Sequence, residues 1–231
     1  MPYTLEVCVD SVASALAAKR GGADRLELCA DLIIGGTTPS LALVRQVKAA
    51  TGLPVRALLR PRFGDFCYDR YELAQMAETA AALVQAGADG IVTGVLTPEG
   101  ELDVDALRPI YAAARAAAKD AGRPVVCTLH RAFDVCKDPF AALEAAKALN
   151  LDTILTSGQA ASAPAGASLL RRLVETAGPD LEILVGAGVT PANLPALAAE
   201  TGAHAFHMSG KQVLDSRMTF RRQGVPMGLP G

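Results

Sequence analysis

The sequence predicts an α/β fold in which eight parallel strands and their intervening helices close into a (β/α)8 barrel of the TIM type. Eight apolar runs typical of strands alternate with alanine- and leucine-rich segments of helical length along the 231 residues. No glycine-rich dinucleotide fingerprint follows the first run, which argues against an open doubly wound sheet. The alternation therefore favours a closed barrel, with a single domain over residues 1–231.

The predicted strands are short and regularly spaced. They cover residues 4–8, 25–29, 54–60, 89–94, 124–130, 152–157, 181–186 and 204–209. Between them we expect seven helices, because each gap has helical length and the composition of a helix.

Capping residues mark where several of these helices begin and end. Helix starts are expected at Ser11, at Asp69, at Asp138 before Pro139, and at Thr190 before Pro191. Three helices are expected to end at a left-handed glycine that re-enters the sheet, in the triplets at residues 22–24, 87–89 and 202–204. These signals recur at the same phase of the βα repeat.

The last segment differs from the other βα units. Residues 211–231 read KQVLDSRMTFRRQGVPMGLPG, and the glycines and prolines leave little room for a full helix. We expect the eighth helix to be short or replaced by an irregular C-terminal tail. The tail can fold over the barrel, contact another subunit or stay in solvent.

Composition and charge narrow the range of partners. The formal net charge of −2 argues against nucleic acid, which is bound largely through clustered basic side chains. The least charged long stretch, residues 153–170, is broken by Ser, Gly and Pro, so no membrane segment is expected. The N-terminus shows no export signal, which predicts a cytoplasmic protein. Its five cysteines include no C-x-x-C pair and are expected to be reduced thiols.

Two stretches nearly repeat each other, LEVC at residues 5–8 and LELC at residues 26–29. The helix-facing side chains of a barrel strand must be apolar, so strand alternation sends the intervening side chains to the interior. This rule turns both Glu-x-Cys pairs inward, and it turns several basic residues inward as well. The residues predicted to face inward are Glu6, Cys8, Arg25, Glu27, Cys29, Arg56, Arg60, His130 and His207. Because active sites of this fold lie at the C-terminal ends of the strands, the cysteines and histidines should surround the mouth.

The two glutamates, one layer below the mouth, have two compatible interpretations. Buried carboxylates need partners, so Glu6 and Glu27 can form an ionic network with Arg25, Arg56 or Arg60. The same carboxylates can act as general acid and base or hold a cation.

Cys8 and Cys29 also have two interpretations. A free cysteine often serves as a small buried hydrophobe, whereas two thiols at the same height on adjacent strands can ligate Cu(I). The neighbouring glutamates are expected to raise the pKa of both thiols and so to oppose thiolate formation.

His130 ends the fifth strand and can be a general base, an anion-binding group or a hydrogen-bonded core histidine. Asp134, four residues later, is a candidate to orient it. After the third strand, the segment RPRFGDFCYD at residues 60–69 can cover the mouth as a lid, and its Arg60 and Arg62 favour an anionic guest.

The loops after the seventh and eighth strands are predicted to bind an anion. Loops at these positions of the fold often bind phosphate through main-chain amides and a helix N-terminus. Gly188, Ser209 and Gly210 would let the main chain approach a phosphate or carboxylate closely.

Nine segments in a fixed order resemble a known family. They are LEVCVDS, GGADRLELC, GGTTPS, RPRFGDFCY, DGIVTGVLTPEGELD, LHRAFD, LTSG, GAGVTPANL and GVPMG. Together they cover essentially the whole chain and resemble the CutC family of copper homeostasis proteins. The resemblance implies a (β/α)8 barrel, a cytoplasmic location, a part in copper handling and self-association, here expected as a homodimer.

Two main functions follow from these observations. The first is a copper homeostasis protein that binds Cu(I) through Cys8 and Cys29. The second is an enzyme of the lyase, isomerase or aldolase type that acts on a small phosphorylated or carboxylated metabolite. Its catalytic candidates are Glu6, Glu27, Arg60, His130 and His207. A third alternative is a binding protein that performs no chemistry.

Overall fold

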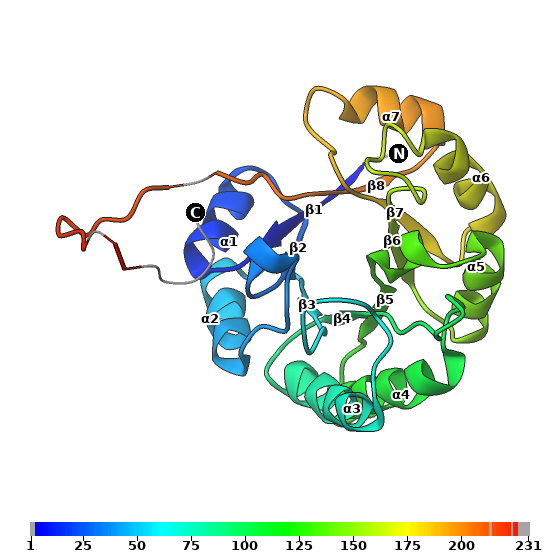
Figure 1. Cartoon of the computed structure of the whole chain (residues 1–231), viewed down its shortest axis with the longest axis horizontal. Helices are drawn as coiled ribbons and strands as arrows, with labels where there is room; N and C mark the ends of the chain where they lie inside the picture. Colours follow the sequence, from blue (N-terminus) through cyan, green and yellow to red (C-terminus); the bar gives the residue numbers. More distant parts are fainter. Residues whose placement is uncertain (1–2, 213, 223, 226–231) are drawn as a thin grey trace.

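The chain forms a closed barrel of eight parallel strands paired in sequence order from β1 to β8, with β8 returning to β1 (Figure 1). The computed structural model describes residues 3–212, 214–222 and 224–225. The strands are β1 (Thr4–Val9), β2 (Arg25–Leu28), β3 (Val55–Leu58), β4 (Gly90–Thr93), β5 (Val126–Leu129), β6 (Thr153–Thr156), β7 (Glu182–Val185) and β8 (Ala205–Met208). All eight lie within the predicted runs or extend them by one residue, so the predicted fold class is confirmed.

A ring of helices surrounds the strands (Figure 1). The helices are α1 (Val12–Arg20), α2 (Leu41–Thr51), α3 (Arg70–Gln85), α4 (Val104–Asp120), α5 (Pro139–Ala148), α6 (Ala167–Ala177) and α7 (Leu194–Thr201), with 3-10 turns η1 (Leu32–Ile34) and η2 (Arg131–Val135). Ser11, Asp69 and Asp138 accept hydrogen bonds from the first-turn amides of α1, α3 and α5, as predicted.

One predicted helix start is wrong. Helix α7 begins at Leu194 rather than at Thr190-Pro191. The Thr190 hydroxyl accepts a hydrogen bond from the Asn193 amide, and the Asn193 side chain accepts one from the Thr190 amide. This reciprocal pair closes a separate turn, so the helix starts only after Asn193.

The C-terminal segment forms no helix among its described residues 209–212, 214–222 and 224–225. Its described part runs away from the barrel instead of covering the mouth (Figure 1). The predicted tail also includes residues 213, 223 and 226–231, which lie outside the described residues. No helix in the described chain combines the length and the apolar character needed to cross a membrane.

The apolar core lies between the outer face of the barrel and the helices, where Leu26, Leu28, Ile91, Leu129 and Phe206 are fully buried. The interior of the barrel is different, because it receives the alternate side chains, and many of these are charged. The strand phase read from the apolar residues is therefore confirmed, and it fixes which side chains meet inside.

Gly90 on β4 makes room for Arg56 in the interior. The two residues are partners across β3 and β4, and a Cβ on Gly90 would lie 2.9 Å from the carbonyl oxygen of Val126 and 3.0 Å from Cγ of Arg56. The first distance is shorter than real Cβ contacts and the second is tighter than nearly all of them, and the Val126 carbonyl belongs to the strand backbone.

We predict that Gly90→Ala lowers the free energy of unfolding by about 1–3 kcal/mol, the usual cost of overpacking a filled interior. Urea denaturation measures the change. Gly21→Ala is the matched control, because Gly21 has φ −77° and a Cβ there would make only ordinary contacts. Equal stability of the two variants would contradict the account of the barrel interior.

Candidate functional site

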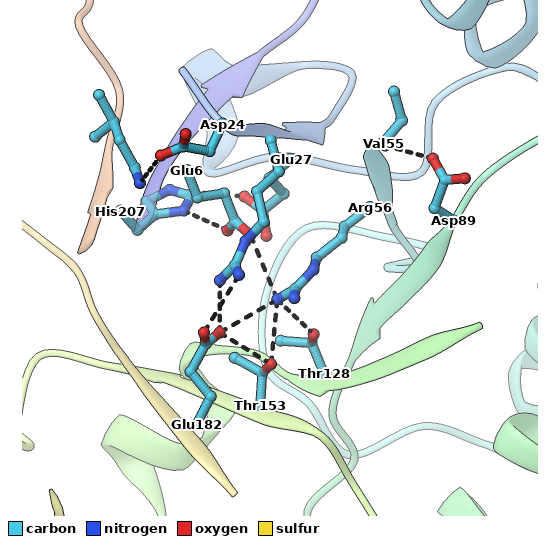
Figure 2. Close-up of polar contacts among 12 residues, drawn as sticks. Glu6, Asp24, Glu27, Val55, Arg56, Asp89, Thr128, Thr153, Glu182 and His207 are labelled. Atoms are coloured by element: carbon cyan, nitrogen blue, oxygen red, sulfur yellow. Dashed lines mark hydrogen bonds and ion pairs between the residues drawn. The ribbon is translucent and has the colours of Figure 1, made fainter. Parts of the chain in front are cut away.

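An ionic network crosses the lower interior of the barrel. Arg25 on β2 donates through Nε to Oε2 of Glu6 at 2.6 Å and through Nη2 to Oε1 of Glu182 at 2.6 Å. Arg56 Nη1 lies 3.5 Å from the same Glu6 oxygen and 3.8 Å from Glu182. Figure 2 shows Glu6, Arg56 and Glu182 pointing toward one another from β1, β3 and β7. The predicted network therefore exists around Glu6.

Arg56 reaches across the barrel to strands that are not its neighbours. Its Nη1 donates to the hydroxyls of Thr153 at 3.1 Å and Thr128 at 3.4 Å (Figure 2). Because these hydroxyls and two carboxylates surround the guanidinium, its buried charge is compensated on several sides.

His207 on β8 connects this network to the mouth. Its Nδ1 lies 2.9 Å from Oε1 of Glu6, and its Nε2 lies 3.8 Å from Oε2 of Glu27. Burial disfavours the imidazolium, but contacts with Cys8, Glu6 and Glu27 outweigh burial and raise the pKa of His207 well above its usual value. Burial likewise opposes the Glu6 carboxylate, yet His207, Arg25 and Arg56 lower the pKa of Glu6 to about 2. Glu6 and His207 therefore form a buried charged pair.

Cys8 and Cys29 meet above this pair, with their Sγ atoms 3.6 Å apart. The hydrogen bond from the Cys29 thiol, reinforced by His207 against the effect of burial, lowers the pKa of Cys8 to about 5. The same contact and burial raise the pKa of Cys29 well above its usual value. The predicted rise is confirmed for Cys29 and wrong for Cys8, where the hydrogen bond from Cys29, together with His207, outweighs burial.

Glu27 completes the cluster, and among the described residues no ion pair joins it to an arginine, so the interpretation that gave it an arginine partner is wrong. It lies opposite Cys8 in the strand register and accepts a contact of 3.6 Å from the Cys29 thiol. Burial, with the nearby charges of Cys8 and Glu6, raises the pKa of Glu27 to about 8 despite the opposing charge of His207. Ligand atoms of Cys8, Glu27 and Cys29 all lie within 4.8 Å of one another.

The cluster opens into a cavity of about 190 Å³ at the C-terminal mouth. Cys8, Glu27, Cys29 and His207 form part of its lining. The remaining wall includes Arg60, Phe66, His130 and Arg131 together with the leucines Leu32, Leu58 and Leu155. The structure thus gathers the predicted cysteines and histidines at the mouth, and Glu6 lies below them.

Two arginines after β3 have different surroundings. Arg60 is buried at the cavity, where it donates to the carbonyls of the β2–α2 and β3–α3 loops. Arg62, predicted to bind an anion, instead pairs with Glu72 at 2.5 Å and Asp65 at 3.0 Å. Those carboxylates hold Arg62 against Asp65 and the first turn of α3, and it does not line the cavity.

Asp134 does not orient His130, contrary to the prediction. Asp134 accepts hydrogen bonds from Thr156 at 2.5 Å and from the amide of Ser157 at 3.0 Å, and pairs with Arg131 at 2.7 Å. His130 Nδ1 accepts a hydrogen bond from the Ala132 amide instead. His130 therefore caps η2, and its orientation comes from the main chain.

The predicted anion-binding loops do come together. Gly188, Ser209 and Gly210 line a second cavity of about 520 Å³, which shares Cys8 and His207 with the first. Lys211 and Arg131 also line it. The two cavities share lining residues at the mouth, and anion binding by these loops stays a prediction.

Two contributors to the site were not singled out from the sequence. Glu182, in the run LEILVG, shares the inward face of its strand with Leu184 and anchors both arginines of the network. Phe66 packs on His130, with ring centroids 4.8 Å apart, and lies under the Arg60 guanidinium. Alternation along the seventh strand would have found Glu182, whereas Phe66 depends on the path of a loop.

Comparison with models of protein families assigns the sequence to a known family. The model of the CutC family matches residues 3–212. The chain belongs to the CutC family. A family protein CutC of Chromobacterium violaceum is 43% identical over 231 residues, which cover all of this chain and 90% of that protein. The human copper homeostasis protein cutC homolog is 42% identical over 226 residues, covering 98% of this chain and 80% of that protein.

Solved structures agree with this CutC assignment. A copper homeostasis protein CutC from Streptococcus agalactiae superposes with a TM-score of 0.81 at 29% identity, covering 89% of this chain and 97% of that one. A Burkholderia cenocepacia protein described as a phosphonomutase gives a TM-score of 0.65 at 24% identity, covering 90% and 87%. The second likeness shows the fold alone.

Glu27 provides a test of the electrostatics. Because the pKa of Glu27 is raised in the folded chain, its contribution to stability is present below the unfolded pKa of about 4.5 and is lost as the pH rises toward 8. Glutamine is neutral throughout this range. We therefore predict that, as the pH rises, the free energy of unfolding of Glu27→Gln increases relative to that of the parent by up to about 1.4 kcal/mol per pH unit. Urea unfolding of both proteins at pH 5 and pH 8 measures the difference.

Glu175→Gln is the control, because Glu175 is exposed on α6. Its free energy of unfolding should follow that of the parent at both pH values. If Glu27→Gln also follows the parent, Glu27 is ionised at neutral pH and the proposed electrostatics are wrong.

Proposed function

We propose that this member of the CutC family binds Cu(I) through Cys8 and Cys29 at the mouth of its barrel. The observation that carries the proposal is the convergence of two thiols 3.6 Å apart, from adjacent strands, at the open end of the fold. The family name of its relatives, copper homeostasis protein, supports a part in copper handling.

The donor set suits Cu(I) better than a hard cation. Thiolate sulfur is a soft ligand that favours Cu(I), whereas calcium and magnesium require several oxygen donors. The cluster consists of the two thiols and the carboxyl group of Glu27. The pKa of Glu27, about 8, keeps this carboxyl group protonated at neutral pH. A protonated carboxyl group is a poor metal ligand, so the thiols dominate.

The surroundings of Cys8 prepare it to bind a metal. Metal binding requires a thiolate, and the lowered pKa of Cys8 supplies one at neutral pH. Cys29 would release its proton when Cu(I) binds, since its pKa is raised in the free protein.

We predict that the Cys8→Ser/Cys29→Ser variant binds Cu(I) at least about 100-fold more weakly than the parent, because serine removes both soft ligands. Competition with a chromogenic Cu(I) chelator under anaerobic conditions measures the affinity. Cys67→Ser is the control, because Cys67 is the exposed thiol and lies outside the cluster. Parent-like affinity in the double variant would exclude this site.

The proposal extends to a cytoplasmic homodimer. Reduced thiols of the kind found here persist in the reducing cytoplasm. The tail exposes several large apolar side chains, among them Leu214, Met218 and Phe220. Exposed apolar groups on one segment favour burial against a partner, and a second copy of the chain is the partner we propose.

We predict that the parent sediments as a dimer and that Met218→Ser/Phe220→Ser sediments as a monomer, because the double variant removes the apolar contacts. Analytical ultracentrifugation measures the mass of each. Arg217→Ser, which changes an exposed neighbour on the same segment, should remain dimeric. A monomeric parent would rule out the dimer, and a dimeric double variant would rule out the tail as its contact.

A further inference from the structure

The mouth carries, just after β3, a buried positive charge without a counter-ion in the described chain. Arg60 is 8% exposed, and the hydrogen bonds of its guanidinium to the described residues all go to main-chain carbonyls, those of Gly35, Gly36 and Gly64. Within residues 3–212, 214–222 and 224–225, no ion pair includes Arg60. A buried cation is costly unless an anion lies near it, so this wall favours an anionic ligand.

His130 adds a directed donor beside this charge. Its Nδ1 accepts the hydrogen bond of the Ala132 amide at 3.1 Å, so the neutral ring holds its proton on Nε2. Burial and the charge of Arg60 lower the pKa of His130 to about 3, which keeps the ring neutral. His130 is 5% exposed, lines the 190 Å³ cavity, and its Nε2 has no hydrogen-bond partner in the described chain.

Two other buried polar atoms without a hydrogen-bond partner lie nearby, Arg60 Nε and the Tyr68 hydroxyl. Burial raises the pKa of the Tyr68 phenol, and the charge of Arg60 opposes that rise. Arg60 and His130 line the cavity and Tyr68 does not, so among the described residues Arg60 and His130 are the two with an unpartnered atom that adjoin a guest.

Apolar side chains form another part of the lining, which also includes Arg131, His207 and the cluster of Cys8, Glu27 and Cys29. Leu32, Leu58, Leu155 and Phe66 surround the polar wall. A volume of about 190 Å³ suits a molecule of a few carbon atoms rather than a nucleotide or a sugar phosphate.

We propose that this cavity binds a small carboxylate with a short carbon chain. One carboxylate oxygen accepts the hydrogen bond of His130 Nε2, the charge of Arg60 compensates the anion, and the carbon chain packs on the leucines. The two polar groups of this site come from the ends of β3 and β5, whereas the proposed copper ligands come from β1 and the end of β2, and all four side chains line the same cavity.

The test is calorimetric titration of the metal-free full chain with pyruvate, with a copper chelator present so that the outcome does not depend on the copper proposal. We expect saturable binding at one site per chain. His130→Asn should weaken it at least tenfold, because asparagine can still accept the Ala132 amide but has no donor at the position of Nε2. His204→Gln, which alters an exposed histidine, should bind like the parent.

A second pair of variants tests the charge and controls for folding. Arg60→Lys and Arg60→Met both remove the three carbonyl contacts of the guanidinium, but lysine alone keeps the charge. We expect pyruvate to bind Arg60→Lys at least tenfold more tightly than Arg60→Met. Absence of saturable pyruvate binding to the parent would overturn the proposal. It would also be overturned by parent-like binding to His130→Asn, or by binding of inorganic phosphate in place of pyruvate.

Discussion

The structure depends on the compensation of the Glu6 carboxylate inside the barrel. This side chain is 1% exposed, and charged groups from three other strands, Arg25, Arg56 and His207, neutralise it. Removal of one member of such a cluster leaves the others as uncompensated buried charges, which typically costs 3–5 kcal/mol. The network therefore holds β1, β2, β3 and β8 in one arrangement, and it fixes the imidazole that reaches the mouth.

A gradient of protonation follows from this network. Glu6 stays ionised at the bottom because cations surround it, whereas Glu27, one level higher, has a raised pKa because burial outweighs the attraction of His207. The same imidazolium helps to lower the pKa of Cys8. One thiolate, one thiol and one carboxylic acid thus face the cavity. The same cavity is also lined by the cation of Arg60 and the neutral imidazole of His130, so its lining combines soft sulfur donors with groups that suit an anion.

Sequence reasoning was reliable where strand alternation decides the outcome. The leucines and valine of LEVC and LELC set the strand phase, and that phase correctly placed Glu6, Cys8 and Cys29 in the interior. It was unreliable where a pairing depends on loops or on distant strands. The sequence predicts an anion as the partner of Arg62 and His130 as the partner of Asp134. Each instead pairs with groups brought close by the loops. Alternation along a strand does not specify those contacts. The lowered pKa of Cys8 depends first on the hydrogen bond from Cys29 and then on His207, which lies 199 residues later in the chain.

The most direct test of the account is X-ray absorption at the copper edge of the Cys67→Ser protein loaded with one equivalent of Cu(I). Removing the exposed Cys67 thiol leaves Cys8 and Cys29 as the thiols of the mouth cluster. If the electrostatics of the barrel interior prepare these thiols for copper, the spectrum will show a first shell dominated by two sulfur atoms. A first shell of nitrogen and oxygen alone would contradict the account.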